Sequence, residues 1–113
     1  MKRITDIRDI YHWAAKKRPG AFVAILAGCF VSFLFEQADE VGRILGEPVS
    51  ATDPYRVLRV HYLKFAEAVR AVQLVTGRMV VLVERVQNGT VFAGPREVKV
   101  FEPVSSKTDG APR

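Results

Sequence analysis

The sequence has few of the residues that build disulfides, metal sites and nucleophilic active sites. It contains one cysteine and two histidines in 113 residues. One cysteine excludes a disulfide within the chain, and His12, His61 and Cys29 do not have the spacing of a zinc site. No apolar run follows the N-terminal positive charges closely enough to form a signal peptide. We therefore expect no metal and no other cofactor, and a protein of the reducing cytoplasm.

Motifs for nucleotide binding and catalysis are also missing. No Gly-x-x-x-x-Gly-Lys-Ser/Thr segment is present, which argues against an ATPase. Cys29 follows an apolar run and is interpreted as a packed thiol, while His12 lies beside the apolar face of a predicted helix, where a structural role is favoured. The acidic pair Asp39-Glu40 is interpreted as part of a solvated helix face. The sequence thus predicts a protein that is not an enzyme.

Negative charge is the scarcer sign. Seventeen Lys and Arg residues against twelve Asp and Glu give a net charge of +5. An excess of positive charge favours polyanionic partners such as nucleic acid. The basic residues are spread along the chain and form no tract, so charge alone does not identify the partner.

The longest stretch without charge, residues 19–35, allows two interpretations. As one helix it would be a short membrane anchor, since a span needs about 20 apolar residues. As a buried strand over residues 21–27, a turn at Gly28 and the start of a helix, it would form the centre of a domain and present Phe30 at a strand-to-helix junction. Leu34, Ala38, Val41 and Leu45 have helical spacing, which favours the second interpretation.

The remaining pattern alternates between helix and strand. We predict helices over residues 6–17 and 63–74, the second with an apolar face of Phe65, Val69, Val72 and Val75. Strands are predicted over residues 56–60, 79–83, 90–93 and 97–101, with a loop over 46–54 and an Asn-Gly hairpin turn at Asn88-Gly89. The expected fold is α/β (α+β), a mixed sheet of about five strands packed with three helices. It forms one domain over residues 1–103, followed by a disordered tail over 104–113.

The order of these elements resembles a known family. The segment Gly28-Cys29-Phe30-Val31-Ser32-Phe33-Leu34 and the acidic helix after it are similar to the Gly-Asp-Phe-Tyr-Glu-Leu-Phe segment and helix of the MutS mismatch-recognition domain. A helix, a glycine turn and a strand ending at Glu84-Arg85 resemble the second half of that domain. The resemblance extends to Gly94-Pro95 and the strand after it, so it covers roughly residues 7 to 103. It implies the fold of the MutS N-terminal domain, free-standing here.

The resemblance also implies a DNA-binding role. In the family, the phenylalanine of Phe-x-Glu stacks on a mispaired base from the minor groove, and the glutamate hydrogen-bonds to that base. Phe30 occupies the phenylalanine position and Ser32 the glutamate position, where a hydroxyl replaces the carboxylate. A structural role for Phe30, packed with Phe33 and Phe35, is the alternative.

The expected function is a DNA-binding module that recognises mismatched or distorted duplex weakly, within a larger repair-like assembly. Its oligomeric state is left open. Protein interaction without mismatch recognition is the alternative, and a small membrane protein is the third possibility. Phe30 and Ser32 are the candidate base contacts, and the candidate phosphate contacts are Lys16, Arg18, Arg56, Arg59 and Arg78.

Overall fold

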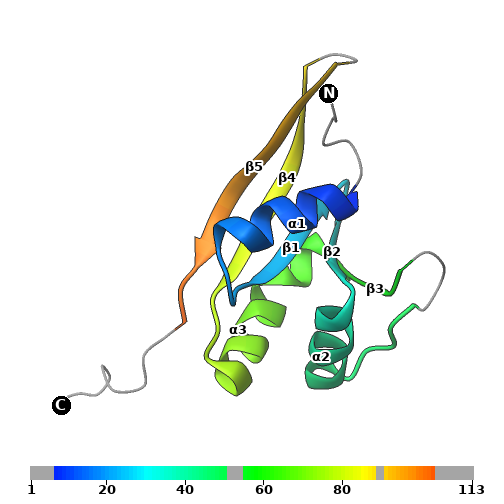
Figure 1. Cartoon of the computed structure of the whole chain (residues 1–113). Helices are drawn as coiled ribbons and strands as arrows, with labels where there is room; N and C mark the ends of the chain where they lie inside the picture. Colours follow the sequence, from blue (N-terminus) through cyan, green and yellow to red (C-terminus); the bar gives the residue numbers. More distant parts are fainter. Residues whose placement is uncertain (1–6, 51–54, 89–90, 104–113) are drawn as a thin grey trace.

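The computed structural model describes residues 7–50, 55–88 and 91–103, with backbone alone at 87, 88 and 91–93 (Figure 1). The predicted tail over 104–113 lies outside these residues. In chain order, the elements are α1 (Ile7–Lys17), β1 (Phe22–Ala27), β2 (Phe30–Leu34), α2 (Glu36–Leu45), β3 (Val57–His61), the short 3-10 helix η1 (Tyr62–Lys64), α3 (Phe65–Thr76), β4 (Val80–Asn88) and β5 (Val91–Phe101). The predicted class, an α+β domain with three helices and a five-stranded mixed sheet, is confirmed.

The sheet has the strand order β3-β2-β1-β4-β5. β1 pairs with β4 in parallel, and the other three pairs are antiparallel. A parallel pair needs a crossover connection. Here β2, α2, β3 and α3 provide it. β3 and β5 are the two edges.

Helices cover both faces of this sheet, with α1 on one face and α2 and α3 on the other (Figure 1). Side chains alternate between the faces along each strand. Val23 and Ile25 of β1 therefore pack with Ile10 and Ala14 of α1. Phe22 and Ala24 pack with α2 and α3 on the other side. Since β1 is buried on both faces, its sequence is uniformly apolar.

The predicted helix start after Gly28 is wrong. Residues 30–34 form β2, which returns antiparallel to β1 with Ala27 opposite Phe30. Gly28 has φ 65°, a conformation that favours glycine at the first position of a tight hairpin turn. α2 begins only at Glu36, so Leu34 ends a strand and does not belong to the helical face. Phe30 thus begins a strand and does not lie at a strand-to-helix junction.

The fold of residues 19–35 also decides whether this uncharged stretch is a membrane helix. Residues 19–35 fold as two strands joined by a turn, so the single-helix interpretation is wrong. Across the parts of the chain that the structure describes, no helix is both long and apolar enough to cross a bilayer.

Two further predictions about strands and helices need correction. Residues 91–101 form one strand that passes through Gly94-Pro95, which the sequence pattern treats as a break. β5 is an edge strand, where a proline without an N–H is tolerated. Val75 is 68% exposed, because at 3.6 residues per turn it lies about 80° around the α3 axis from Phe65. Asn88, predicted as a turn residue, is instead the last residue of β4 and pairs with Val91, while Gly89 and Thr90 lie outside the described residues.

Candidate nucleic-acid interface

Phe30 lies at the end of the sheet, on the surface. Its side chain is 43% exposed, whereas Phe33 is buried in the core, so the interpretation of Phe30 as a core residue is wrong. Phe30 is opposite His61 in the β2–β3 register, and the two rings meet edge to face with centroids 5.5 Å apart. The contact with His61 holds the ring at one edge and leaves much of its surface open.

Ser32 is placed differently from Phe30. It lies two residues further along β2, between Ile25 of β1 and Arg59 of β3, and is only 3% exposed. A hydroxyl enclosed in the sheet cannot meet a base edge, so the expected base contact by Ser32 is inconsistent with this burial. Phe30 is therefore the surface member of the Phe-x-Ser pair.

The surface next to His61 is apolar. Tyr62 is 49% exposed and Leu63 is 83% exposed. With Leu26, Gly28, Cys29 and His61 they line a hollow of about 450 Å³ beside the β1–β2 turn. The Cys29 thiol is exposed, so the interpretation of a packed thiol is wrong. Cys29 occupies the turn between β1 and β2, at the end of the sheet.

Three of the five candidate phosphate contacts are engaged by carboxylates. Arg18 forms two hydrogen bonds with Glu97, of 2.6 and 2.9 Å. Arg56 donates to Asp39 at 2.9 Å. Arg78 donates to Glu40 at 3.3 Å and to the Gly20 carbonyl at 2.9 Å, with its guanidinium 3.9 Å from the centre of the Phe22 ring. These contacts give Arg78 a structural role.

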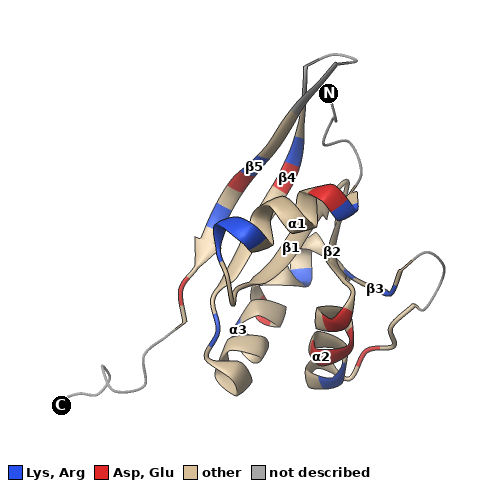
Figure 2. Cartoon of the chain, in the orientation of Figure 1, with Lys and Arg blue, Asp and Glu red and all other residues tan. Residues whose placement is uncertain are grey.

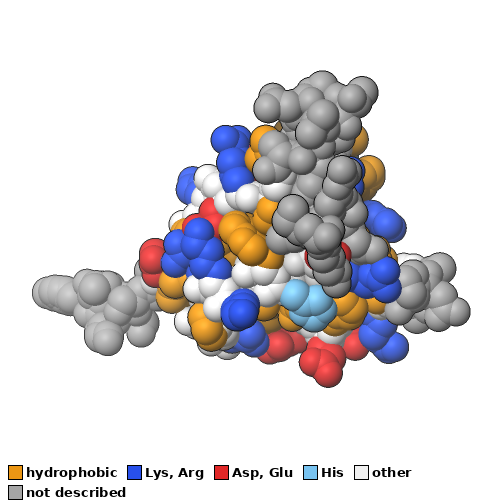
Figure 3. All heavy atoms as spheres, turned by 45° about the horizontal axis from the view of Figure 1, so that its top comes forward, with side chains coloured by type: hydrophobic (Ala, Val, Ile, Leu, Met, Phe, Trp, Pro, Cys, Tyr) orange, Lys and Arg blue, Asp and Glu red, His pale blue; other side chains and the backbone are white. Residues whose placement is uncertain are grey.

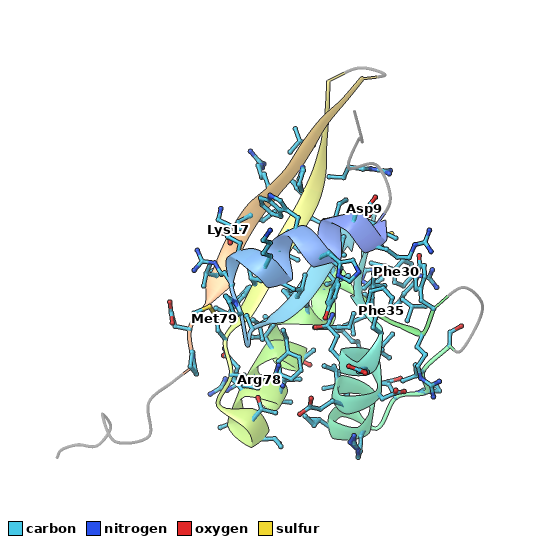
Figure 4. All side chains as sticks on the ribbon, in the orientation of Figure 1. Asp9, Lys17, Phe30, Phe35, Arg78 and Met79 are labelled. Carbon is cyan, nitrogen blue, oxygen red and sulfur yellow. The ribbon has the colours of Figure 1, made fainter. Side chains whose placement is uncertain are left out.

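The five candidates do not form one patch. Lys and Arg side chains are spread over helices and strands (Figure 2), and on the face in Figure 3 they are separated by acidic and hydrophobic side chains. Lys16 and Arg18 lie at the C-terminal end of α1 and just after it. Figure 4 shows Lys17 and Arg78 on the opposite side of the molecule from Phe30. Arg59 is the candidate beside Phe30, on the neighbouring strand.

The Arg59 side chain lies on the same face of the sheet as Phe30. Its register partner Ser32 is two residues from Phe30 on β2, and residues two apart in a strand share a face. Its side chain is exposed. Among the described residues no ion pair to Arg59 is formed. Its charge is therefore available to an anion.

Phe35 belongs to a second aromatic group that the sequence pattern does not reveal. Its ring centroid is 5.0 Å from Tyr11, 5.6 Å from His12 and 5.7 Å from Tyr55. Tyr11, Phe35 and Tyr55 are half-buried, and they line a hollow of about 470 Å³ with His12, Glu36 and Arg56. His12 stacks on Phe35 and is exposed, so its expected structural role stays a prediction. Three separate parts of the chain supply these rings, so no local motif could have indicated the group.

The backbone at Phe35 is strained. Phe35 has φ 65° and ψ −142°, and it is the single non-glycine residue with positive φ in the described part of the chain. That region of conformational space belongs almost entirely to glycine. It is adopted where the chain leaves β2 and enters α2, and it keeps the ring among Tyr11, His12 and Tyr55.

Among the acids that the structure describes, Glu97 is the one whose pKa is shifted by the fold. The hydrogen bonds from Arg18 hold the pKa of Glu97 below its ordinary value, and the same pairing raises the pKa of Arg18. The pair joins the end of α1 to β5, away from Phe30. Its role is therefore in packing.

Comparison with known proteins adds no family assignment. No protein-family model and no curated protein sequence matches this chain. Among the described residues, no group of three or more His, Cys, Asp or Glu side chains could hold a metal ion.

Proposed function

We propose that this chain is a non-enzymatic DNA-binding module of the cytoplasm that uses Phe30 as a stacking side chain. The observation that carries the proposal is the position of the Phe30 ring, 43% exposed at the sheet end and next to Arg59, to which no described residue forms an ion pair. The resemblance to the MutS mismatch-recognition domain supports the same residue.

The physical basis is the cost of separating stacked bases. A wedge side chain between two base pairs costs a few kcal/mol of stacking, and a mismatched or unpaired position costs least. A module that offers one ring and no base-edge contact selects positions by how easily they unstack. Ser32 is buried, so base identity contributes little to the choice.

The interface of one such module is small. Single DNA-binding modules bury about 600–1,000 Å² of protein surface, and three of the basic candidates here are held by carboxylates. Binding is therefore weak and salt-sensitive, and becomes stronger when the module joins a larger repair-like assembly.

The test compares two labelled duplexes by fluorescence anisotropy at low salt, one fully matched and one with a single unpaired nucleotide. The wild-type chain binds the second duplex better, and Phe30→Ala removes the difference while Phe30→Tyr keeps it. Leu74→Ala is the matched control, since Leu74 is an exposed apolar side chain of α3. Equal affinity of the wild-type chain for both duplexes, or an equal loss in the Leu74→Ala control, contradicts the proposal.

The alternative is a protein-interaction module, and Leu63 is the observation that favours it. An 83% exposed leucine beside Tyr62 and a hollow is typical of a protein-binding surface. This alternative predicts no DNA binding at low salt, and a protein partner that Leu63→Ser releases in a pull-down from the host.

A further inference from the structure

Two aromatic groups lie at the two ends of β2. At its start, the Phe30 ring contacts His61. Directly after its end, the Phe35 ring lies among Tyr11, His12 and Tyr55. The two phenylalanines are five residues apart, and at 3.3 Å per strand residue they are separated by at most about 17 Å. Figure 4 shows both on the same side of the molecule.

Positive side chains accompany both groups. Arg59 lies on β3 between His61 and Tyr55, two residues before His61, and leaves the sheet on the face of Phe30. Arg8, in the first turn of α1, places its guanidinium 5.7 Å from the centre of the Tyr55 ring. We name Phe30, His61, Arg59, Tyr55, Phe35 and Arg8 the aromatic track.

The conformation of Phe35 suggests that the second group has a use beyond packing. Residues held in rare backbone conformations are destabilising and cluster at binding and active sites. A glycine at position 35 would avoid the strain but would provide no ring. The chain instead has a phenylalanine there, in the wall of an open hollow of about 470 Å³.

We propose that the aromatic track binds a single-stranded nucleic acid of about five nucleotides, at the 3.4 Å spacing of a stacked strand. The proposal rests on the proposed function, in which Phe30 stacks on a base, and adds a second stacking position at Phe35 and Tyr55. Arg59 contacts the phosphates between the two positions.

An unpaired strand fits the track better than a duplex does. Two stacking positions along one strand need several bases whose faces are free. In a duplex the base faces are stacked on one another, and a wedge side chain can open only a single weak step. Aromatic stacking beside a positive side chain tolerates any base, since every base has a π face. Ser32 is buried, so its hydroxyl does not read a base beside Phe30. The preferred ligand is therefore a single strand, with little dependence on base sequence.

The experiment measures binding of labelled single strands by fluorescence anisotropy at low salt. The probes are oligothymidines of two, five and ten nucleotides, an oligouridine of ten, and the matched duplex. We expect affinity to rise at least about fivefold from the two-nucleotide to the five-nucleotide probe, because the second stack is gained there. Similar affinity for the ten-nucleotide thymidine and uridine probes shows that the track accepts DNA and RNA alike, and a difference shows which of the two it binds better.

Two variants test the track itself. Tyr55→Ala weakens binding of the five-nucleotide probe at least about fivefold and leaves the two-nucleotide probe little changed. Arg59→Glu weakens all probes, whereas Arg70→Glu, the same charge change on an exposed residue of α3 across the sheet, has a much smaller effect. Arg59→Glu changes an exposed side chain and removes no packed ring, so this variant is expected to fold. It therefore tests the track even if Tyr55→Ala does not fold.

The outcomes separate this inference from the proposed function. Binding of an unpaired-nucleotide duplex that depends on Phe30, without binding of single strands, overturns the track and leaves the proposed function standing. Equal losses in Arg59→Glu and Arg70→Glu also overturn the track, because general charge would then explain the binding. If no nucleic acid binds at low salt, both fail.

Discussion

The Gln37 side chain takes the place of a strand partner for Val23. Its Nε2 donates to the Val23 carbonyl at 2.6 Å, and the Val23 N–H donates to its Oε1 at 2.9 Å. Ile25 still pairs with Ser32 on β2, but Val23 lies beyond that pairing, where the chain has turned through Phe35 into α2. The amide of Gln37, only 9% exposed, satisfies both backbone groups of Val23 there.

Gln37→Leu should destabilise the fold by about 2–4 kcal/mol. The leucine fits the volume but leaves a buried N–H and a buried carbonyl without partners, and each costs about 1–3 kcal/mol. Urea unfolding followed by circular dichroism measures the change, with Glu36→Gln, an exposed neighbour in the same turn, as the control. An unchanged midpoint for Gln37→Leu contradicts the role assigned to this side chain.

Phe35 offers a comparison of two truncations. Phe35→Ala and Phe35→Gly both lose the ring contacts, but the alanine keeps a strained positive φ and the glycine does not. We expect the glycine variant to be the more stable by about 1–2 kcal/mol, the reverse of the usual order for these residues. Urea unfolding midpoints of the two variants, measured in parallel, test this order of stability. An alanine variant that is equally or more stable would show that the backbone at position 35 is unstrained.

Gly42 is packed too closely for a side chain. A Cβ at this position would lie 2.7 Å from Val49 Cγ2 and 3.0 Å from the Glu47 carbonyl oxygen. Gly42→Ala should therefore cost about 1–3 kcal/mol despite its better helix propensity. Adding Val49→Ala to Gly42→Ala should recover part of that loss, and a double-mutant cycle by urea unfolding measures the recovery. If the two effects simply add, the clash does not set the cost.

The Arg18–Glu97 pair should make stability depend on pH in the acid range. The pKa of Glu97 is lowered in the folded chain, so its contribution is present above the ordinary glutamate pKa and is lost as pH falls through the lowered one. The wild-type chain should thus have a higher melting temperature than Glu97→Gln at neutral pH, and the difference should shrink on acidification. Both residues are partly exposed, which keeps the effect small. A difference that stays constant with pH contradicts this assignment.

The salt dependence of nucleic-acid binding should show whether Arg59 contacts a phosphate. The logarithm of the binding constant falls linearly with the logarithm of salt concentration, by about 0.7 per phosphate contact on a single strand. Arg59→Gln should reduce that slope by about this amount, and Arg70→Gln should leave it unchanged. Titrations at several salt concentrations give the slopes, and equal slopes for the wild-type chain and Arg59→Gln remove Arg59 from the contact.

Much of the fold could be predicted because local patterns agree with the final arrangement. The apolar spacing of α1 and the uniformly apolar sequence of β1 each indicate their element. β2 was missed because Leu34 has helical spacing with Ala38 and Val41, which hides the strand before them. The decisive feature is the backbone of Phe35, which no pattern indicates.

Of the candidate site, the sequence indicated Phe30 but not which of its neighbours are exposed. Phe30 was identified from its resemblance to a family motif, and its place beside a glycine turn agrees with an exposed ring. The burial of Ser32 and the ion pairs of Arg18, Arg56 and Arg78 depend on partners distant in sequence, such as Glu97, 79 residues from Arg18.

The sequence by itself determined the class of the fold and the buried central strand, because hydrophobic periodicity and turn residues act locally. Only the tertiary structure decided which polar and aromatic side chains are available to a ligand. Exposure and pairing depend on which elements become neighbours: Phe30 meets His61 because β2 pairs with β3, and Phe35 meets Tyr11 and His12 of α1.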